Sequence, residues 1–150
     1  MYKKEESLGR LVSILNRVGQ SHIGKKLEPY DIGIGQCVFL AELLLKDGIC
    51  QDELALNFSC DKATASRAIQ YLERHGYVER KQSKDDGRVK KVFVTEKARE
   101  FQPVLFSILE EWTETLFQGF SAEDKELALR LLHRIVKTAL KTKISEGEGS

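Results

Sequence analysis

The sequence predicts a mainly α-helical protein with one small β-hairpin. Apolar residues recur at helical spacing along most of the chain, and only residues 77–95 change to a strand-like pattern around a polar turn. At 150 residues, with 41% hydrophobic and 31% charged side chains, the chain is long enough for one ordinary domain with appended helices. This composition excludes a disordered polymer and a pair of large catalytic domains.

The N-terminal segment predicts an amphipathic helix. Its apolar positions are Leu8, Leu11, Val12, Leu15 and Val18. They share one helical face, and the pattern continues loosely to Leu27, before Pro29 stops it because proline lacks an amide proton. A dense apolar set over 36–46 then predicts a short buried helix that ends at Asp47–Gly48.

Two short helices follow, over 51–57 and 62–75, joined by a tight connection. Asp61 is a favourable N-cap for the second helix, and Gly76 is a favourable left-handed residue after its end. Two helices joined by a four-residue turn form a helix-turn-helix. Residues 77–82 and 89–95 then predict two strands around the charged turn 83–88, so 31–95 predicts a winged helix-turn-helix with this turn as the wing.

The C-terminal part predicts two further helices. The first starts at Glu96, is expected to be kinked or broken near Pro103, and ends at Gly119, whereas the second opens at Ser121. Residues 145–150 have nothing to bury and are expected to form a disordered tail. The predicted division is an N-terminal helix over 1–30, the winged helix-turn-helix over 31–95, C-terminal helices over 96–144 and the tail.

Positive charge is concentrated on the second helix of the pair and on the wing. The whole chain has a net charge of only +1, but residues 62–95 hold nine basic and four acidic side chains. A lysine-rich hairpin edge also discourages aggregation between sheets. Its coincidence with a helix-turn-helix favours contact with the phosphates of double-stranded DNA.

The candidate DNA-binding residues are polar side chains on the exposed face of 62–75 and basic side chains on the wing. They are Lys62, Thr64, Ser66, Arg67, Gln70, Tyr71, Arg74, Lys84, Arg88 and Lys90. Thr64, Ser66 and Arg67 lie near the helix end that enters a major groove. Arg88, at the wing tip, suits a narrow minor groove or forms a local ion pair with Asp85 or Asp86.

These residues resemble the MarR family of winged helix-turn-helix transcriptional regulators. The resemblance rests on Asp61–Arg67, on Leu72–Arg80, which is similar to the family's "LE..G..ER", and on Asp86-Gly87-Arg88 followed by Val94-Thr95. It covers nearly the whole chain. It implies a homodimer, most often a repressor, in which the first helix and the last two helices interlock. Each subunit then presents a winged helix to half of a pseudo-palindromic operator. A cytoplasmic location is expected because the charged N-terminal segment lacks the continuous hydrophobic core of a secretory signal.

The resemblance also implies regulation by a small, commonly phenolic, anion bound between the dimerisation helices and the winged helix. The matching region offers Arg17, His22 and Tyr30 as candidate effector-binding residues. Alternatives to a ligand-responsive regulator are a winged helix that serves as a protein-interaction module and a thiol-based redox sensor.

The sequence predicts neither an enzyme nor a metal or cofactor site. The cysteines, Cys37, Cys50 and Cys60, form no CxxC pair, and the histidines have no metal-ligand spacing with them. No glycine-rich phosphate loop or pair of catalytic carboxylates is recognisable. The apolar runs are far shorter than the roughly 20 residues that cross a bilayer, so no membrane partner is expected.

Overall fold

The computed structural model describes residues 1–85 and 87–148, with side chains as far as 144. The chain divides into two compact units, Met1–Trp112 and Thr113–Ser150, and each is described by itself. The helices are α1 (Leu8–Leu27), α2 (Ile34–Leu45), α3 (Gln51–Asn57), α4 (Lys62–Arg74), α5 (Glu96–Leu116) and α6 (Ala122–Glu148). The strands are β1 (Ile49–Cys50), β2 (Val78–Gln82) and β3 (Lys90–Val94), and the 3-10 turns are η1 (Lys4–Glu6) and η2 (Glu28–Tyr30).

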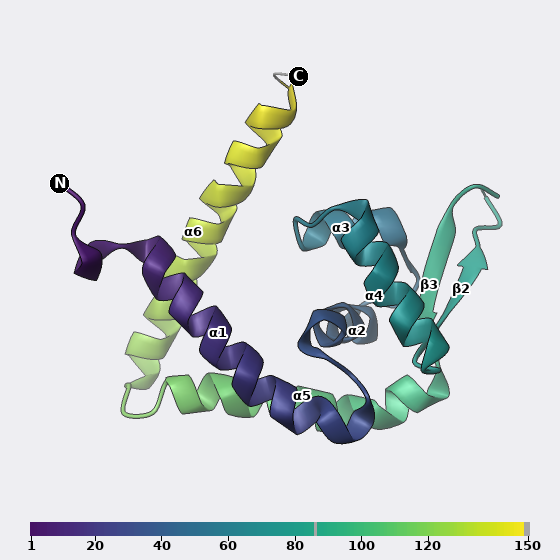
Figure 1. Ribbon diagram of the computed structural model, residues 1–150, viewed down its shortest axis with the longest axis horizontal. Coiled ribbons are helices and arrows are strands. Elements are labelled where there is room, and N and C mark those ends of the chain that lie inside the picture. Colours follow the sequence, from purple (N-terminus) through teal and green to yellow (C-terminus); the bar gives the residue numbers. More distant parts are fainter. Residues whose placement is uncertain (86, 149–150) are drawn as a thin grey trace. The chain divides into compact units, whose positions relative to one another are not determined.

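The predicted fold class is confirmed, and the helix-turn-helix elements match their predicted ranges closely. α3 and α4 pack against each other, and the β2–β3 hairpin follows α4 directly (Figure 1). Asp61 caps α4 by accepting a hydrogen bond from the Thr64 N–H, with 2.6 Å between Oδ1 and nitrogen. Gly76 ends the segment with a φ of +77°, as its predicted role requires.

The sheet has a third strand that the sequence pattern does not predict. The order is β1-β3-β2, and both pairs are antiparallel. β1 contributes only two residues, with Ile49 opposite Val92. Such a short strand leaves no alternating pattern in the sequence, because its pairing depends on β3 lying beside it.

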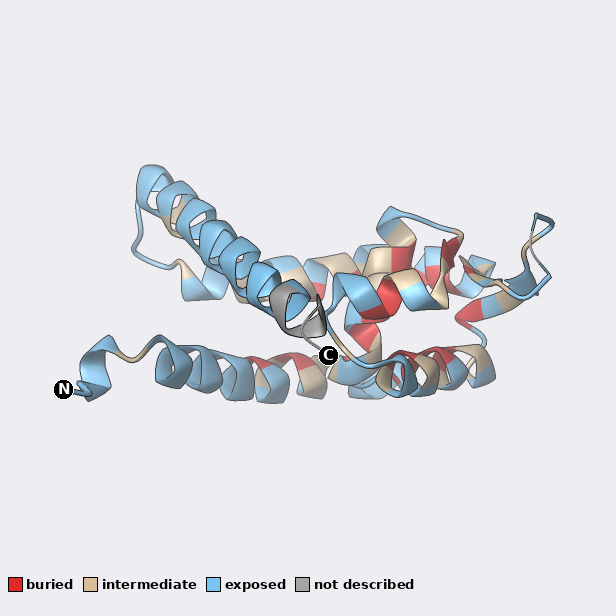
Figure 2. Ribbon diagram, turned by 90° about the horizontal axis from the view of Figure 1, so that it is seen from above, coloured by how far each residue is buried: buried red, intermediate tan, exposed pale blue. Residues whose placement is uncertain are grey.

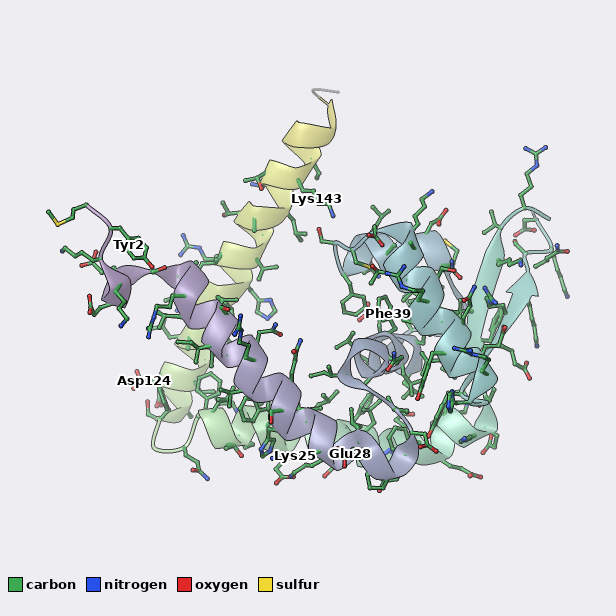
Figure 3. The ribbon with its side chains drawn as sticks, viewed as in Figure 1. Tyr2, Lys25, Glu28, Phe39, Asp124 and Lys143 are labelled. Carbon is green, nitrogen blue, oxygen red and sulfur yellow. The ribbon has the colours of Figure 1, made fainter. Side chains whose placement is uncertain are left out.

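The core of the first unit lies where α2, α4, α5 and the hairpin meet. Its largest fully buried side chains come from these elements, from the end of α1, and from α3 and β1. They include Leu27, Leu40, Leu43, Ile69, Leu72, Val78, Val92 and Leu105. Phe39 extends from α2 toward α3 (Figure 3), where its ring centroid lies 4.9 Å from that of Phe58. Buried residues are absent from the described N-terminal half of α1, which is exposed in Figure 2.

The first compact unit extends past residue 96, where the predicted domain boundary lies. α5 contributes Ala98, Phe101, Leu105 and Ile108 to the core of the first unit, so residues 96–112 belong with the winged helix. The helix runs without a break through Pro103, so of the two predicted alternatives, a kink or a break, the break is wrong. Packing of the flanking apolar residues holds the helix together although proline removes one of its backbone hydrogen bonds.

The second unit consists of the end of α5, a turn and α6. The Ser121 Oγ accepts a hydrogen bond from the Asp124 N–H at 3.1 Å, which confirms Ser121 as the predicted helix start. α6 continues to Glu148, so the backbone of 145–148 is helical rather than the start of the predicted tail. Extending an existing helix adds one backbone hydrogen bond for each residue fixed, so a helix can continue beyond its last apolar residue. Residues 149–150 lie outside the described part.

Gly48 offers a test of the turn that joins α2 to the sheet. Its φ is +72°, and an added Cβ would lie 3.0 Å from the Phe93 ring. We expect Gly48→Ala to lower the free energy of unfolding by about 1–3 kcal/mol, because L side chains strain this conformation.

The matched control is Gly24→Ala, within α1, where an added Cβ meets nothing within 4 Å. This change should leave stability equal or raise it by up to about 1 kcal/mol. Urea unfolding curves of both variants measure the difference, and equal effects of the two substitutions would contradict the role given to Gly48.

Candidate nucleic-acid interface

The two faces of α4 have opposite character. Ala65, Ala68, Ile69 and Leu72 are buried in the core. The residues between them therefore face away from the core, because positions three and four apart share a helical face. The exposed face is the one on which the sequence predicts DNA contacts.

Most of the predicted contact residues on α4 are accessible. Lys62, Arg67, Gln70 and Arg74 are exposed, and Thr64 and Ser66 are half-buried. Arg67 Nη2 donates a hydrogen bond to Thr64 Oγ1 at 3.2 Å, so these two side chains lie together near the start of the helix. Nitrogen-bearing side chains are visible along α4 and the hairpin in Figure 3. The structure thus brings the predicted polar residues together on one surface.

Tyr71 differs from the other predicted contact residues. Its hydroxyl donates a 2.8 Å hydrogen bond to the Asp31 carbonyl, and its ring stacks on His75 with centroids 4.0 Å apart. Tyr77 makes a parallel contact, donating from its hydroxyl to the Tyr30 carbonyl at 2.8 Å. Both tyrosines therefore fasten the winged helix to the connection after α1, a link between distant residues that local sequence patterns do not reveal.

The wing carries its predicted basic residues on the surface. Lys84, Arg88 and Lys90 are all exposed. The turn is closed by a hydrogen bond of 2.7 Å from the Ser83 N–H to the Val89 carbonyl. Asp86, one of the two predicted partners of Arg88, lies outside the described residues. The wing and the exposed face of α4 belong to the same compact unit.

An ion pair that the sequence analysis missed joins α4 to the hairpin. Arg80 on β2 donates from Nε and Nη2 to the two carboxylate oxygens of Glu73, at 3.1 and 3.0 Å. The hydrogen bonds from Arg80 hold the Glu73 pKa below its ordinary value, and the same pair raises the Arg80 pKa. Glu73 is the Glu of "LE" and Arg80 is the Arg of "ER" in the motif quoted above. The motif therefore contains both partners of the ion pair, and the pair could have been proposed from it.

The three candidate effector residues do not form one site. Arg17 and His22 line an open cavity of about 560 Å³ with Lys25 and Lys26. Tyr30 lines another, of about 490 Å³, beside α5, and Lys26 is common to both. His22 stacks against Trp112 with centroids 4.9 Å apart, and its buried Nε2 has no hydrogen-bond partner among the described residues.

The cysteines differ in their surroundings. Burial raises the pKa of the Cys37 thiol to about 11, which suppresses the reactive thiolate at neutral pH. Cys50 and Cys60 are half-buried. Within the described residues, no group of three or more His, Cys, Asp or Glu side chains is arranged to hold a metal ion. No described helix is long and apolar enough to cross a membrane.

Comparisons with known proteins identify relatives of the whole chain. The model of the MarR family matches residues 34–90. The uncharacterised HTH-type transcriptional regulator YybA of Bacillus subtilis is 33% identical over 128 residues, which span 85% of each chain. A MarR transcriptional regulator from Methanosarcina mazei is 41% identical in its crystal structure, with a TM-score of 0.86 over 90% of this chain and 97% of that one.

A further solved structure shares the fold alone. It is a MarR family regulator, named as putative, from Listeria monocytogenes in complex with a 26mer DNA, 23% identical, with a TM-score of 0.90 over 97% of each chain. The DNA in that structure is bound by the Listeria protein.

The Glu73–Arg80 pair should make stability depend on pH. Because the folded pKa of Glu73 is lowered, its contribution is complete above the ordinary carboxyl pKa of about 4.3 and is lost as pH falls through the lower folded value. We expect Glu73→Gln to unfold at a lower temperature than the wild type near pH 7, with the difference shrinking toward pH 3. Thermal unfolding followed by circular dichroism measures it.

The control is Glu79→Gln, which removes the carboxylate of an exposed pair with Lys81, 3.6 Å apart. Exposed pairs contribute little, so this variant should match the wild type at every pH. If the difference in unfolding temperature between Glu73→Gln and the wild type stayed constant from pH 7 to pH 3, the pKa of Glu73 would not be lowered by its pair with Arg80.

Proposed function

The chain belongs to the MarR family of transcriptional regulators, and from this we propose that it binds a pseudo-palindromic duplex operator as a homodimer and represses transcription there. Proteins of this family bind DNA and catalyse no reaction, so the protein acts by occupying a site on the DNA. Repression follows where the occupied operator overlaps a promoter. A regulator of this kind acts in the cytoplasm, where the DNA is.

The proposal is carried by one observation. A polar helix face and a cationic wing lie on the same compact unit, and the segment that forms them, 62–95, holds nine basic and four acidic side chains. The remainder of the chain has more acidic than basic residues. Neutralising phosphates releases counterions from DNA, which supplies affinity, and polar side chains in the grooves supply specificity.

We assign the readout to two elements. The exposed face of α4, with Ser66, Arg67 and Gln70, enters the major groove, where each base pair presents a distinct set of donors and acceptors. Arg88 at the wing tip enters the neighbouring minor groove, whose negative potential favours a guanidinium. Lys62, Arg74, Lys84 and Lys90 contact phosphates.

The terminal helices support a dimer. α1 exposes Leu8, Leu11, Val12, Leu15 and Val18 on one face. Within the second unit α6 exposes a similar set, namely Leu127, Leu131, Leu132, Ile135, Val136 and Leu140. Apolar stripes of this length are unfavourable in water and are usual at subunit interfaces. Two winged helices held by such an interface would read two half-sites.

A small organic anion is the proposed effector. The cavity beside Arg17 and His22 also has Lys25 and Lys26 on its wall, which favours a carboxylate, and the ring of His22 on that wall stacks against Trp112. Tyr30 lines a separate cavity, so we assign it a second point of contact with the effector, apart from the one at Arg17 and His22. A coupling of about 1–3 kcal/mol between anion and DNA would change occupancy several-fold or more.

Arg88 and Gln70 distinguish phosphate attraction from base readout. We expect Arg88→Ala to weaken binding to most duplexes and to reduce the slope of log affinity against log salt by about one, because one cation is lost. Gln70→Ala should weaken only some operator variants. Fluorescence anisotropy with the DNA upstream of the coding region and its point variants measures both.

If Gln70→Ala lost the same affinity for every operator variant, Gln70 would not contact bases. Wild-type affinity that does not change with salt would overturn DNA binding through phosphates. Both residues are exposed, so thermal stability should stay within about 0.5 kcal/mol of the wild type and serves as the folding control.

The apolar face of α1 tests the dimer. Leu15→Lys should shift the protein from dimer to monomer at micromolar concentration, because it places a charge within the stripe. Ser13→Lys, on the polar side of the same helix, should leave the dimer intact. Sedimentation velocity separates the two results, and a monomeric wild type would instead favour the protein-interaction module.

A further inference from the structure

A cationic cavity lies between the wing and the start of α3. It has a volume of about 320 Å³ and is lined by Cys50, Gln51, Asp52, Arg80, Arg88, Val89 and Lys90. We propose that this cavity seats one backbone phosphate of the bound duplex, with Arg80 and Lys90 as its ligands. The proposal rests on the DNA-binding function above and adds to it Arg80, together with a defined cavity in which Arg80 and Lys90 hold the same phosphate.

The register of the hairpin explains why the cavity is cationic. Val78 pairs with Val94, Arg80 with Val92, and Gln82 with Lys90, and alternate residues of a strand share a face. Val78 and Val92 on this face are fully buried. Toward the wing tip the same face continues with Arg80 and Lys90. The inner side of the hairpin therefore changes from apolar to basic at the point where the core ends.

Arg80 is held in place before any ligand arrives. Glu73 binds it through Nε and Nη2, and its side chain is only 21% exposed. A guanidinium has five N–H donors, so a carboxylate on one edge leaves donors for a second anion. Because the side chain is already oriented, little rotamer freedom is lost when it binds a phosphate.

Lys90 supplies the charge that the neutral Glu73–Arg80 pair lacks. Its ammonium is close enough to the pair to lower the Glu73 pKa by its charge. The acidic residue on the cavity wall, Asp52, lies 3.5 Å from the ammonium of Lys62, which offsets its charge. With Arg88 also on the wall, cations outnumber carboxylates, and the favoured ligand is an anion.

The position of the cavity indicates a duplex phosphate. Its walls are the hairpin and the start of α3, and both of these elements contact α4. If α4 enters a major groove and the wing the next minor groove, the sugar–phosphate strand that separates the two grooves must pass between them. A phosphodiester on that strand then meets Arg80 and Lys90. Free inorganic phosphate has the same chemistry, so the experiment must separate the two sources.

Adjacent lysines on β3 provide the main test. Lys90→Gln and Lys91→Gln remove the same charge from neighbouring residues, but only Lys90 lines the cavity, and Lys91 lies on the opposite face. With the full-length protein and a labelled mixed-sequence duplex, we expect Lys90→Gln to reduce the slope of log affinity against log salt by about 0.9. Lys91→Gln should change it by less than half as much. Equal changes would overturn the proposal.

A second variant tests the role of Glu73 as a positioning residue. Glu73→Gln makes the protein more positive, so long-range attraction alone predicts tighter binding to DNA. If Glu73 orients Arg80 toward a phosphate, binding should instead weaken several-fold, with the folded state verified by circular dichroism. Affinity that rises in Glu73→Gln would contradict the orienting role and the phosphate seat with it.

Two further measurements separate the sources of the anion. Replacing single phosphates of the duplex by neutral methylphosphonates should reveal one position per half-site whose loss weakens the wild type but not Lys90→Gln. Titration of the DNA-free protein with inorganic phosphate should show no sub-millimolar binding. Such binding, abolished in Lys90→Gln, would identify a free-anion site instead and overturn the assignment.

The outcomes for the two proposals are distinct. A wild-type protein that fails to bind duplex DNA removes the proposed function. A wild-type protein that binds DNA, loses affinity in Arg88→Ala, and responds equally to the two lysine changes retains the function and loses only this phosphate site.

Discussion

The packing of α4 against α2 is the constraint on which the rest of the structure depends. Ile69 and Leu72 are fully buried with Leu40 and Leu43 of α2, and this contact fixes the rotation of α4 about its axis. Once that face is buried, the residues between them must point outward. The polar face is therefore presented by the energetics of the core, at about 25 cal/mol for each Å² of apolar surface removed from water.

Burial of one face also determines how the hairpin is oriented, through the two-residue alternation of a strand instead of the repeat of a helix. Val78 and Val92 anchor it to the core, and the alternation of the strands then determines where each basic residue lies. Asp47 reinforces this arrangement, accepting hydrogen bonds from the Gly48 and Val94 N–H groups and from Arg99 of α5. The wing projects from a base that is held by both the sheet and α5.

Within the first unit, two hydrogen bonds join the connection after α1 to α4 and to the residue before β2. Tyr71 and Tyr77 bind the carbonyls of Asp31 and Tyr30, directly after α1. The Tyr30 side chain lines a cavity with α5 and lies against Phe101, with centroids 4.7 Å apart. The backbone of Tyr30 and Asp31 therefore links the wall of this cavity to α4 and to the residue before β2.

Periodicity and the helix-ending residues were enough to predict α1 to α4, the hairpin and the polar face of α4 from sequence. Those features follow from neighbours a few residues apart, whose preferences for helix, turn or strand are local. β1, the inclusion of residues 96–112 in the first unit, the Glu73–Arg80 pair and the engagement of Tyr71 needed the tertiary structure. Each joins residues from separate elements, and only the folded core sets how close those elements come.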